Sequence, residues 1–300
     1  MKHMRKFQTQ LECEAYINSE QYVEPFVGLV AETREISYNK IAPPSLTFNI
    51  TSPGTIVWKT SSTAFTKTIS YSTDSGATWT DITSNTGSSA PTINVNAGDK
   101  VMFKGNNAAY CDSSYRSNSF SGSTAGFEVE GNIMSLIDST GFTTATTLTS
   151  AYTFYCLFRG CTGLTSAENL VLPATTLANY CYNCMFYNCT ALTTAPSILP
   201  ATTLSQACYN GMFQNCSSLT TAPELPATTL PDYCYSYMFN GCSSLNYIKC
   251  LATDISASNC TSSWVYGVAS SGTFVKNSNM SSWTTGDNGI PTGWTVQDAS

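Results

Sequence analysis

The hexapeptide Leu-Pro-Ala-Thr-Thr-Leu occurs three times, at 172–177, 199–204 and 225–230, in steps of 27 and 26 residues. A second element, Cys-Tyr-x-x-Met-Phe-x-x-Cys-x-x-Leu, keeps the same phase, and degenerate copies precede and follow the three clear ones. Residues 136–264 therefore hold about five units of 26–27 residues. Because one such unit cannot bury both of its faces, this period predicts stacked coils with atypical ends, which together make a solenoid.

The pattern inside one unit predicts how the coils pack. Apolar residues three apart in Met-Phe-x-x-Cys-x-x-Leu favour a helical or 3₁₀ turn with one apolar face, whereas the Pro and β-branched Thr of the hexapeptide favour extended backbone. Stacking in register would give a parallel sheet along one side and three buried columns. The columns are Phe158, Phe186, Phe213 and Phe239; Cys161, Cys189, Cys216 and Cys242; and Cys181, Cys208, Cys234 and Cys260.

The chain has 13 cysteines, most of them within the repeats. An odd number at repeat spacing favours buried free thiols, which pack as small hydrophobic groups. Disulfides are one alternative. Zinc is another, but the single close pair, Cys181-x-x-Cys184, has no second CxxC to complete a site.

The segments outside the repeats differ in composition. Residues 1–40 hold 11 of the 32 charged residues and predict a docking arm or a disordered tail, with a short helix at 9–18 and extended chain from Phe26 to Tyr38. Residues 41–135 show alternating apolar strands and regular turns, which predict a small β-sandwich of immunoglobulin-like type. Residues 265–300 are expected to form a C-terminal cap. The expected fold class is mainly β.

Two tryptophans of the β-rich region have alternative interpretations. Trp58 and Trp79 are expected in the core of the sandwich, although a sugar-stacking platform is the alternative. Asp74, Asp81 and Asp99 occupy predicted turns, where Asp commonly bonds its own backbone; calcium binding is the alternative.

Composition excludes several classes of chemistry. The single histidine, His3, rules out Ser-His-Asp and Cys-His catalysis and multi-histidine metal sites. A net charge of −6 disfavours a nucleic-acid partner. No apolar stretch is long enough to span a bilayer, so we expect no membrane insertion. The acids of the repeats, Glu168, Glu224, Asp232 and Asp254, all fall at different phases of the unit, so we expect no convergent carboxylate pair, no enzyme activity and no cofactor.

Tyrosines recur at one phase of the repeat and allow two interpretations. Tyr182, Tyr209 and Tyr235 follow the first cysteine of each clear unit. If these rings point outward, they form a strip suited to stacking on sugar rings; if they point inward, they belong to the core. The sequence leaves both interpretations open.

The Phe-x-x-Cys-x-x-Leu core, followed by a Pro-containing extended segment, resembles the BspA-like leucine-rich repeats, with LPATTL in place of the commoner isoleucine-proline strand. This resemblance implies a binding or adhesion scaffold of gut and oral bacteria and their mobile elements, not an enzyme. The segments Glu12–Ile17, Tyr22–Val27 and Tyr38–Lys40 are similar to the N-termini of virion proteins of crAss-like Bacteroides phages. That similarity implies docking to a capsid or tail protein, for which the candidate residues are Tyr16, Tyr22, Pro25, Phe26 and Tyr38.

Together these features predict a non-enzymatic phage virion protein, a fibre or decoration protein of head or tail, assembled in the bacterial cytoplasm. Its arm would dock on the particle, its repeats would contact a host surface protein or glycan, and it would form a homo-oligomer, by resemblance a trimer. The alternative is an adhesion protein of the bacterial cell surface, which the lack of a recognisable signal peptide disfavours.

Overall fold

The computed structural model describes residues 5–6, 26–30, 34–38, 44–281 and 283–299. The chain divides into two compact units, Met1–Pro43 and Pro44–Ser300, so the boundary falls just beyond the expected residue 40. In the first unit, β1 (Arg5–Lys6) pairs in parallel with β2 (Phe26–Val30), which pairs antiparallel with β3 (Arg34–Tyr38). Extended chain is thus confirmed in β2 and β3; the helix expected at 9–18 lies outside the described residues.

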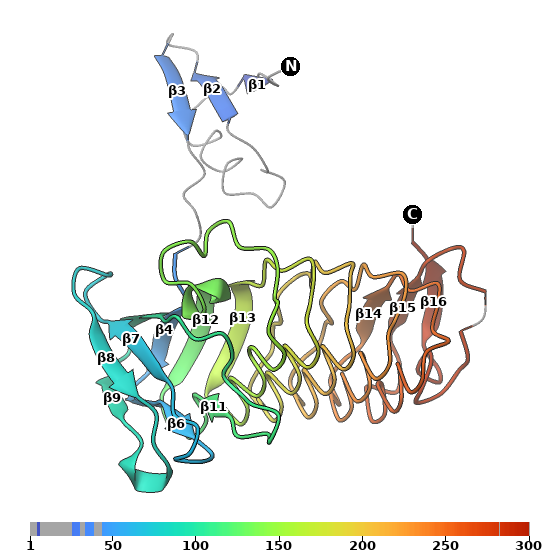
Figure 1. Ribbon diagram of the computed structural model, residues 1–300. Helices are drawn as coiled ribbons and strands as arrows, with labels where there is room; N and C mark the ends of the chain where they lie inside the picture. The colour runs from blue at the N-terminus through green and yellow to red at the C-terminus, as the bar shows by residue number, and fades with distance from the viewer. Residues whose placement is uncertain (1–4, 7–25, 31–33, 39–43, 282, 300) are drawn as a thin grey trace. The chain divides into compact units, whose positions relative to one another are not determined.

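The second unit begins with two β layers (Figure 1). One layer is a six-stranded sheet in the order β13-β12-β4-β10-β7-β8. Its strands are β4 (Thr47–Ser52), β7 (Thr68–Ser72), β8 (Thr80–Thr83), β10 (Lys100–Lys104), β12 (Gly126–Asn132) and β13 (Leu164–Val171). The other layer holds two short pairs: β5 (Gly54–Val57) with β9 (Thr92–Val95), and β6 (Lys59–Thr60) with β11 (Asn118–Ser119). The helical segments of the described chain are two 3₁₀ turns, Gly87–Ser89 and Ile133–Leu136.

Aromatic rings fill the space between these layers. The Phe48 ring lies 4.7–4.8 Å from the rings of Phe103, Phe120 and Phe127. Trp58 is buried against Phe120, as its alternating strand pattern predicted. Trp79 differs from expectation: it is half-buried, with the Lys104 ammonium 4.0 Å from its ring centroid. The mainly β prediction is confirmed, whereas the immunoglobulin-like type stays a prediction.

The sequence predicted a domain boundary at residue 135, and one hydrophobic core extends across that position from the two-layer region into the repeats. Strand β12 pairs antiparallel with β4 on one side and in parallel with β13, a repeat segment, on the other. Gly163 permits the contact, since a Cβ there would lie 2.2 Å from the Ala125 carbonyl oxygen. The sheet therefore passes from one region into the other without a boundary.

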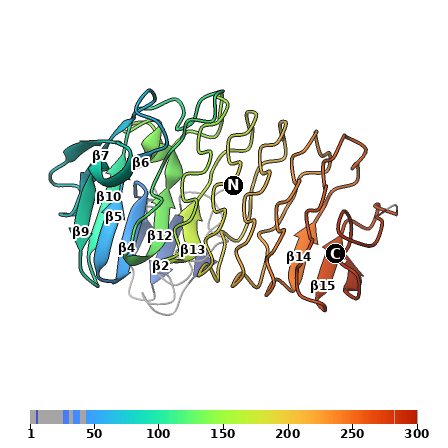
Figure 2. The same ribbon diagram turned by 90° about the horizontal axis from the view of Figure 1, so that it is seen from below.

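A parallel ladder then follows the stacked coils to the C-terminal end. Single bridges join Ser166 to Thr194, Thr194 to Thr221, and Thr221 to Tyr247. The ladder continues through β14 (Tyr247–Cys250), β15 (Thr273–Lys276) and β16 (Thr295–Asp298), all parallel. Figure 2 shows these segments side by side along one face of the coils. The expected parallel pairing is therefore present as strands at the two ends of the stack, whereas in the coils between them it consists of isolated bridges, both before and within the hexapeptide.

The opposite side of each coil is a chain of turns, so the predicted helical or 3₁₀ conformation of this segment is wrong. Every fourth residue has positive φ, as at Tyr180 (58°), Cys184 (54°) and Asn188 (60°). Such residues interrupt a helix. Successive backbone N–H groups donate alternately within their own coil and to the next coil. The Met185 N–H donates to the Tyr182 carbonyl of the same coil, and the Phe186 N–H donates to the Met212 carbonyl of the next coil. This alternation satisfies the buried backbone without helix or long strand.

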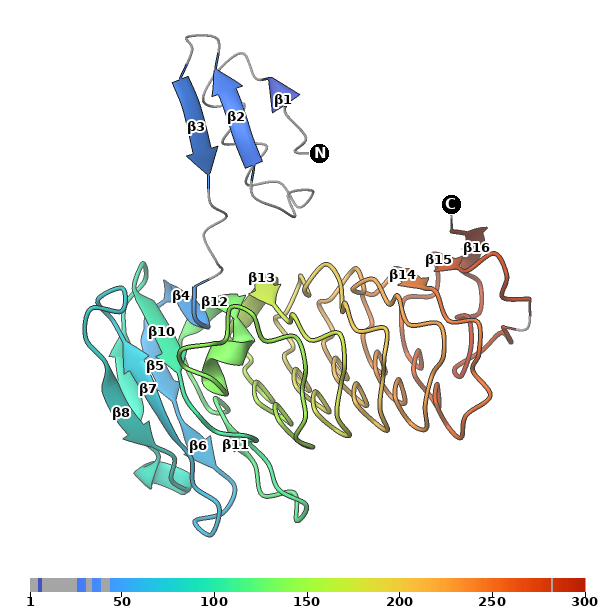
Figure 3. The same ribbon diagram turned by 45° about the horizontal axis from the view of Figure 1, so that its top comes forward.

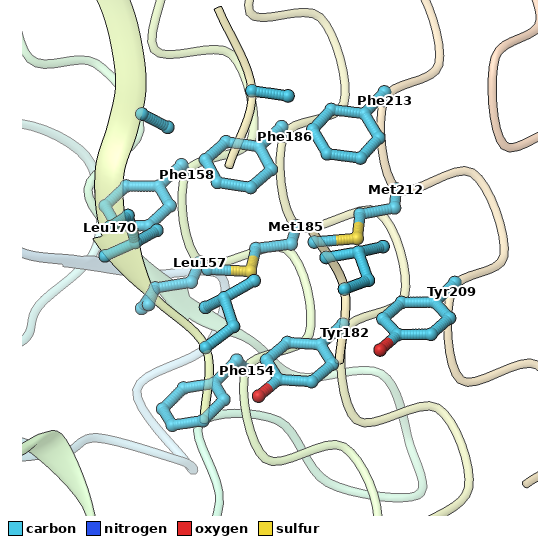
Figure 4. Close-up of a cluster of buried hydrophobic side chains, with 14 of the residues drawn as sticks. Phe154, Leu157, Phe158, Leu170, Tyr182, Met185, Phe186, Tyr209, Met212 and Phe213 are labelled. Atoms are coloured by element: carbon cyan, nitrogen blue, oxygen red, sulfur yellow. The ribbon is translucent and has the colours of Figure 1, made fainter. Parts of the chain in front are cut away.

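Identical side chains stack in columns inside the coils (Figure 4). The Phe158, Phe186 and Phe213 rings are parallel with centroids 5.3 Å apart, and Phe213 stacks on Phe239 at 5.8 Å. Both predicted cysteine columns are buried, and the described cysteines are free thiols. In one column the Cys189, Cys216 and Cys242 thiols donate to the carbonyl of the preceding coil's Phe at 3.0–3.1 Å.

The stack ends on aromatic residues. Trp264 stands at the phase that Met238 holds in the preceding coil. Its buried ring stacks on Tyr235 at 6.2 Å and on Trp283 at 5.6 Å. Trp294 is buried and donates its indole N–H to the Ala269 carbonyl. Residues 265–299 therefore cover the final coil and also add β15 and β16 to the ladder.

Candidate functional site

The docking residues of the N-terminal segment fall mostly outside the described residues. This applies to Tyr16, Tyr22 and Pro25. Phe26 and Tyr38 are described in backbone only, and they are direct partners in the β2–β3 pair. The two residues therefore share one position of the antiparallel ribbon, and docking through them stays a prediction.

The tyrosine column is part of the core, so its interpretation as an exposed glycan strip is wrong. Tyr182, Tyr209 and Tyr235 are each 1% exposed. Tyr182 stacks on Phe154 at 5.6 Å and on Tyr209 at 5.7 Å. Burial raises the pKa of all three phenols well above the usual value. These rings act as packing groups, the other interpretation that the sequence allowed.

Other tyrosines, half-buried or exposed, lie at neighbouring phases of the repeat. Tyr180, one residue before Cys181, stacks on Tyr152 with centroids 4.9 Å apart. Tyr237 and Tyr266 are 43% and 58% exposed. Tyr152, Tyr180 and Tyr237 all have positive φ, a backbone property that recurs at every fourth residue of the turns and that the sequence does not display.

A hollow on the described coils follows the parallel ladder, and we call it the ladder groove. Its volume is about 400 Å³. Figure 3 shows the side of the coils on which it lies, between β13 and β14. It is lined by Glu168, Thr193, Thr194, Ala195, Pro196, Ser197, Thr220, Thr221, Ala222, Glu224, Tyr247 and Lys249. Hydroxyl groups on an open surface suit hydrogen bonding to a polar, uncharged ligand.

Two carboxylates line the ladder groove, contrary to the expectation that acids at different phases would not converge. The segments before the hexapeptide are seven, six and five residues long, at 165–171, 193–198 and 220–224. This shortening moves Glu224 into register with Ile198 and onto the face that also holds Glu168. Glu224 forms an ion pair with Lys249 at 3.1 Å. The groove thus has one paired and one exposed carboxylate beside threonine hydroxyls.

Two thiols on adjacent coils, Cys156 and Cys184, have pKa values shifted in opposite directions. Cys184 is half-buried, and a hydrogen bond from the Cys156 thiol, assisted by the nearby Arg159 charge, lowers the Cys184 pKa. The same bond and burial raise the pKa of Cys156. Cys184 thus contacts Cys156, not Cys181 of the CxxC pair. No group of three or more His, Cys, Asp or Glu within the described residues has the geometry to hold a metal ion.

Comparison with protein-family models, with curated proteins and with solved structures finds no match to this chain. Within the residues that the structure describes, no helix has the length and apolar character required to cross a membrane. The function is therefore argued from the chain's own residues.

Proposed function

We propose that this protein is a non-enzymatic structural and attachment protein of a phage particle, held by residues 1–40 and presenting its repeat coils to a host surface. The observation that carries the proposal is the ladder groove: an open, hydroxyl-lined surface that runs across several coils of a rigid stack. A surface of this kind suits contact with an extended polymer better than enclosure of one small substrate.

We further propose that the coils form a leucine-rich-repeat-type solenoid related to the BspA-like proteins. The Phe and Cys columns, the 26–27-residue period and the parallel ladder on one side support this assignment. Stacked repeats place binding residues on the face that carries the ladder. The groove occupies that face.

The chemistry of the groove favours a glycan as the surface ligand. Thr194 and Thr221 present hydroxyls on neighbouring coils, and Tyr247 adds a half-buried ring on the next one. Sugars are bound by hydroxyl hydrogen bonds together with an aromatic face. The Glu224–Lys249 ion pair neutralises its own charges and so leaves most of the floor uncharged.

Attachment to the particle rests on residues 1–40. We propose that β2 and β3 present a ribbon to a capsid or tail protein, and that copies of the chain assemble at that position as a homo-oligomer, by resemblance a trimer. The high charge density of this segment relative to the rest of the chain supports a separate role for it.

Deletion of residues 1–40 tests the anchoring step, because Pro44–Ser300 is a compact unit with its own core. Purified particles should lose the truncated protein while the infected-cell lysate retains it in soluble form. Incorporation at the normal level would refute the docking role. Recovery of the full chain on the surface of uninfected cells would favour the alternative, a bacterial adhesion protein.

Substitution in the groove tests the binding step. Thr221→Arg places a long side chain on the exposed groove floor, whereas Thr228→Arg makes the same change at an exposed position of the same coil outside the groove. On an array of host polysaccharides, the full chain and the Thr228→Arg variant should bind alike, and Thr221→Arg should lose binding. Equal binding by all three would exclude the groove as the attachment surface.

A further inference from the structure

A second hollow, of about 290 Å³, lies where the two-layer region meets the first repeat coil. We propose that it binds an oxyanion group, a sulfate, carboxylate or phosphate, carried by a molecule of monosaccharide size. This inference goes beyond the proposed attachment through the ladder groove and uses a separate set of residues.

Strand geometry gathers hydroxyls and one cation on a single face. Lys59 pairs with Ser119 across β6 and β11, and the Ser61 N–H continues the ladder by donating to the Ser117 carbonyl at 2.9 Å. Because side chains alternate along strands, these four residues and Ser121 face one side, whereas Thr60 and Asn118 face the core. The result is a row of hydroxyls beside an ammonium group.

The repeat coil supplies the second cation from the other side of the hollow. Arg159 is exposed, with its guanidinium 5.1 Å from the centroid of the Tyr187 ring. No Asp or Glu of the described residues lines the hollow. Neither Lys59 nor Arg159 takes part in an ion pair with a described carboxylate. Two unneutralised cations thus converge in a protein with a net charge of −6.

The neutral groups around the hollow retain protons to donate. The Ser61 hydroxyl oxygen accepts from the Ser117 N–H at 2.9 Å, which leaves its own proton free for a ligand. The Asn188 side-chain oxygen accepts a hydrogen bond from the Asn215 side-chain NH₂ at 2.9 Å. The NH₂ group of Asn188 is therefore oriented away from that bond. A guanidinium, an ammonium, hydroxyls and an amide form a donor set that matches the acceptor oxygens of an oxyanion.

The size of the hollow selects among anions. A volume of about 290 Å³ is far larger than the ~30 Å³ share of one water molecule, and it is close to the lower end of small-ligand sites. A bare ion would leave most of this space to water. An acidic group attached to a sugar ring would fill it, with the ring lying over the serine hydroxyls.

Titration calorimetry of the purified full chain tests the proposal with N-acetylglucosamine 6-sulfate, glucuronic acid, N-acetylglucosamine and inorganic sulfate. The two acidic sugars should bind at least tenfold more tightly than the neutral sugar. Tighter binding of the sulfated sugar than of inorganic sulfate would identify the source as a substituted sugar, whereas equal binding would refute a ligand of monosaccharide size. No preference for any anion would overturn the proposal.

Charge-neutralising variants locate the site. Arg159→Gln and Lys59→Gln should each weaken binding of the sulfated sugar about tenfold or more, whereas Lys104→Gln, which removes a lysine charge over Trp79, should not change it. An equal loss in all three would mean general charge attraction and would refute the site. Because these assays need neither particle nor polysaccharide, their outcome is distinct from that of the groove experiments.

Discussion

Replacement of Phe186 by alanine should reveal how strongly one column supports the coils. The ring is fully buried and stacks on Phe158 and Phe213, each at 5.3 Å. Lost burial alone is worth about 1.5–3 kcal/mol, and the cavity left in a close-packed stack raises the cost of such changes to about 3–5 kcal/mol. The loss of two stacked ring contacts favours the upper half of that range. A small domain has a stability of only about 5–15 kcal/mol.

Urea unfolding followed by tryptophan fluorescence measures this cost, with Phe186→Leu as the matched control. Leucine retains most of the volume, so its cost should be about 1–1.5 kcal/mol. The Phe186→Ala and Phe213→Ala changes should couple by about 0.5–3 kcal/mol in a double-mutant cycle, because the rings touch. An alanine variant no less stable than the leucine variant, with additive effects in the cycle, would refute the column as a source of stability.

Three further measurements address single features. Iodoacetamide labelling with peptide mass spectrometry should modify Cys184 before Cys189, because the pKa of Cys184 is lowered whereas burial raises that of Cys189 to about 12; simultaneous labelling would contradict this order. Hydrogen bonds from Thr78 and Ser72 lower the pKa of Asp74 from 3.8 to about 2. The ionised Asp74 carboxylate therefore stabilises the folded state fully above about pH 4, and this contribution is lost as the pH falls through 2. Asp74→Asn should consequently flatten the acid dependence of the melting temperature. Gly241 and Gly267 have φ of 76° and 74°, but a Cβ at Gly241 would lie 2.2 Å from a neighbouring asparagine oxygen, whereas one at Gly267 has its nearest neighbour at 3.7 Å. Thermal melts should therefore show a larger loss for Gly241→Ala than for Gly267→Ala, and equal losses would exclude the steric contact.

The columns could be predicted from sequence because the period alone determines them. Once units of 26–27 residues stack in register, residues at one phase must meet, as Phe158 and Phe186 do. The turn conformation was missed because three-residue spacing is shared by helices and by these turns. The signal that separates the two conformations is local. In every clear unit, Gly or Asn stands directly before the cysteine of the Cys189, Cys216 and Cys242 column. Asn188 and Gly241 are examples, and both positions have positive φ.

The ladder groove was harder to predict because it depends on small departures from the period. The loss of one residue per coil between 165–171, 193–198 and 220–224 changes which side chain faces outward. Glu224 therefore shares a surface with Glu168, although their sequence phases differ. Likewise, nothing in residues 41–135 signals that β12 pairs with a repeat segment, since that contact joins residues distant in sequence.

The two proposed binding surfaces lie where the repeat is imperfect. A perfect repeat offers the same side chain on every coil, and such a column is best used for packing, as the Phe and Cys columns are. Arg159 occupies the position that holds Tyr187, Gln214 and Asn240 on the following coils, so a cation is found at this phase only on the coil that faces Lys59. Glu224 similarly stands in register with the apolar Ile198 of the preceding coil. Departures from the consensus at exposed phases, combined with strict conservation of phase inside, are therefore the places in this chain where ligand chemistry is to be sought.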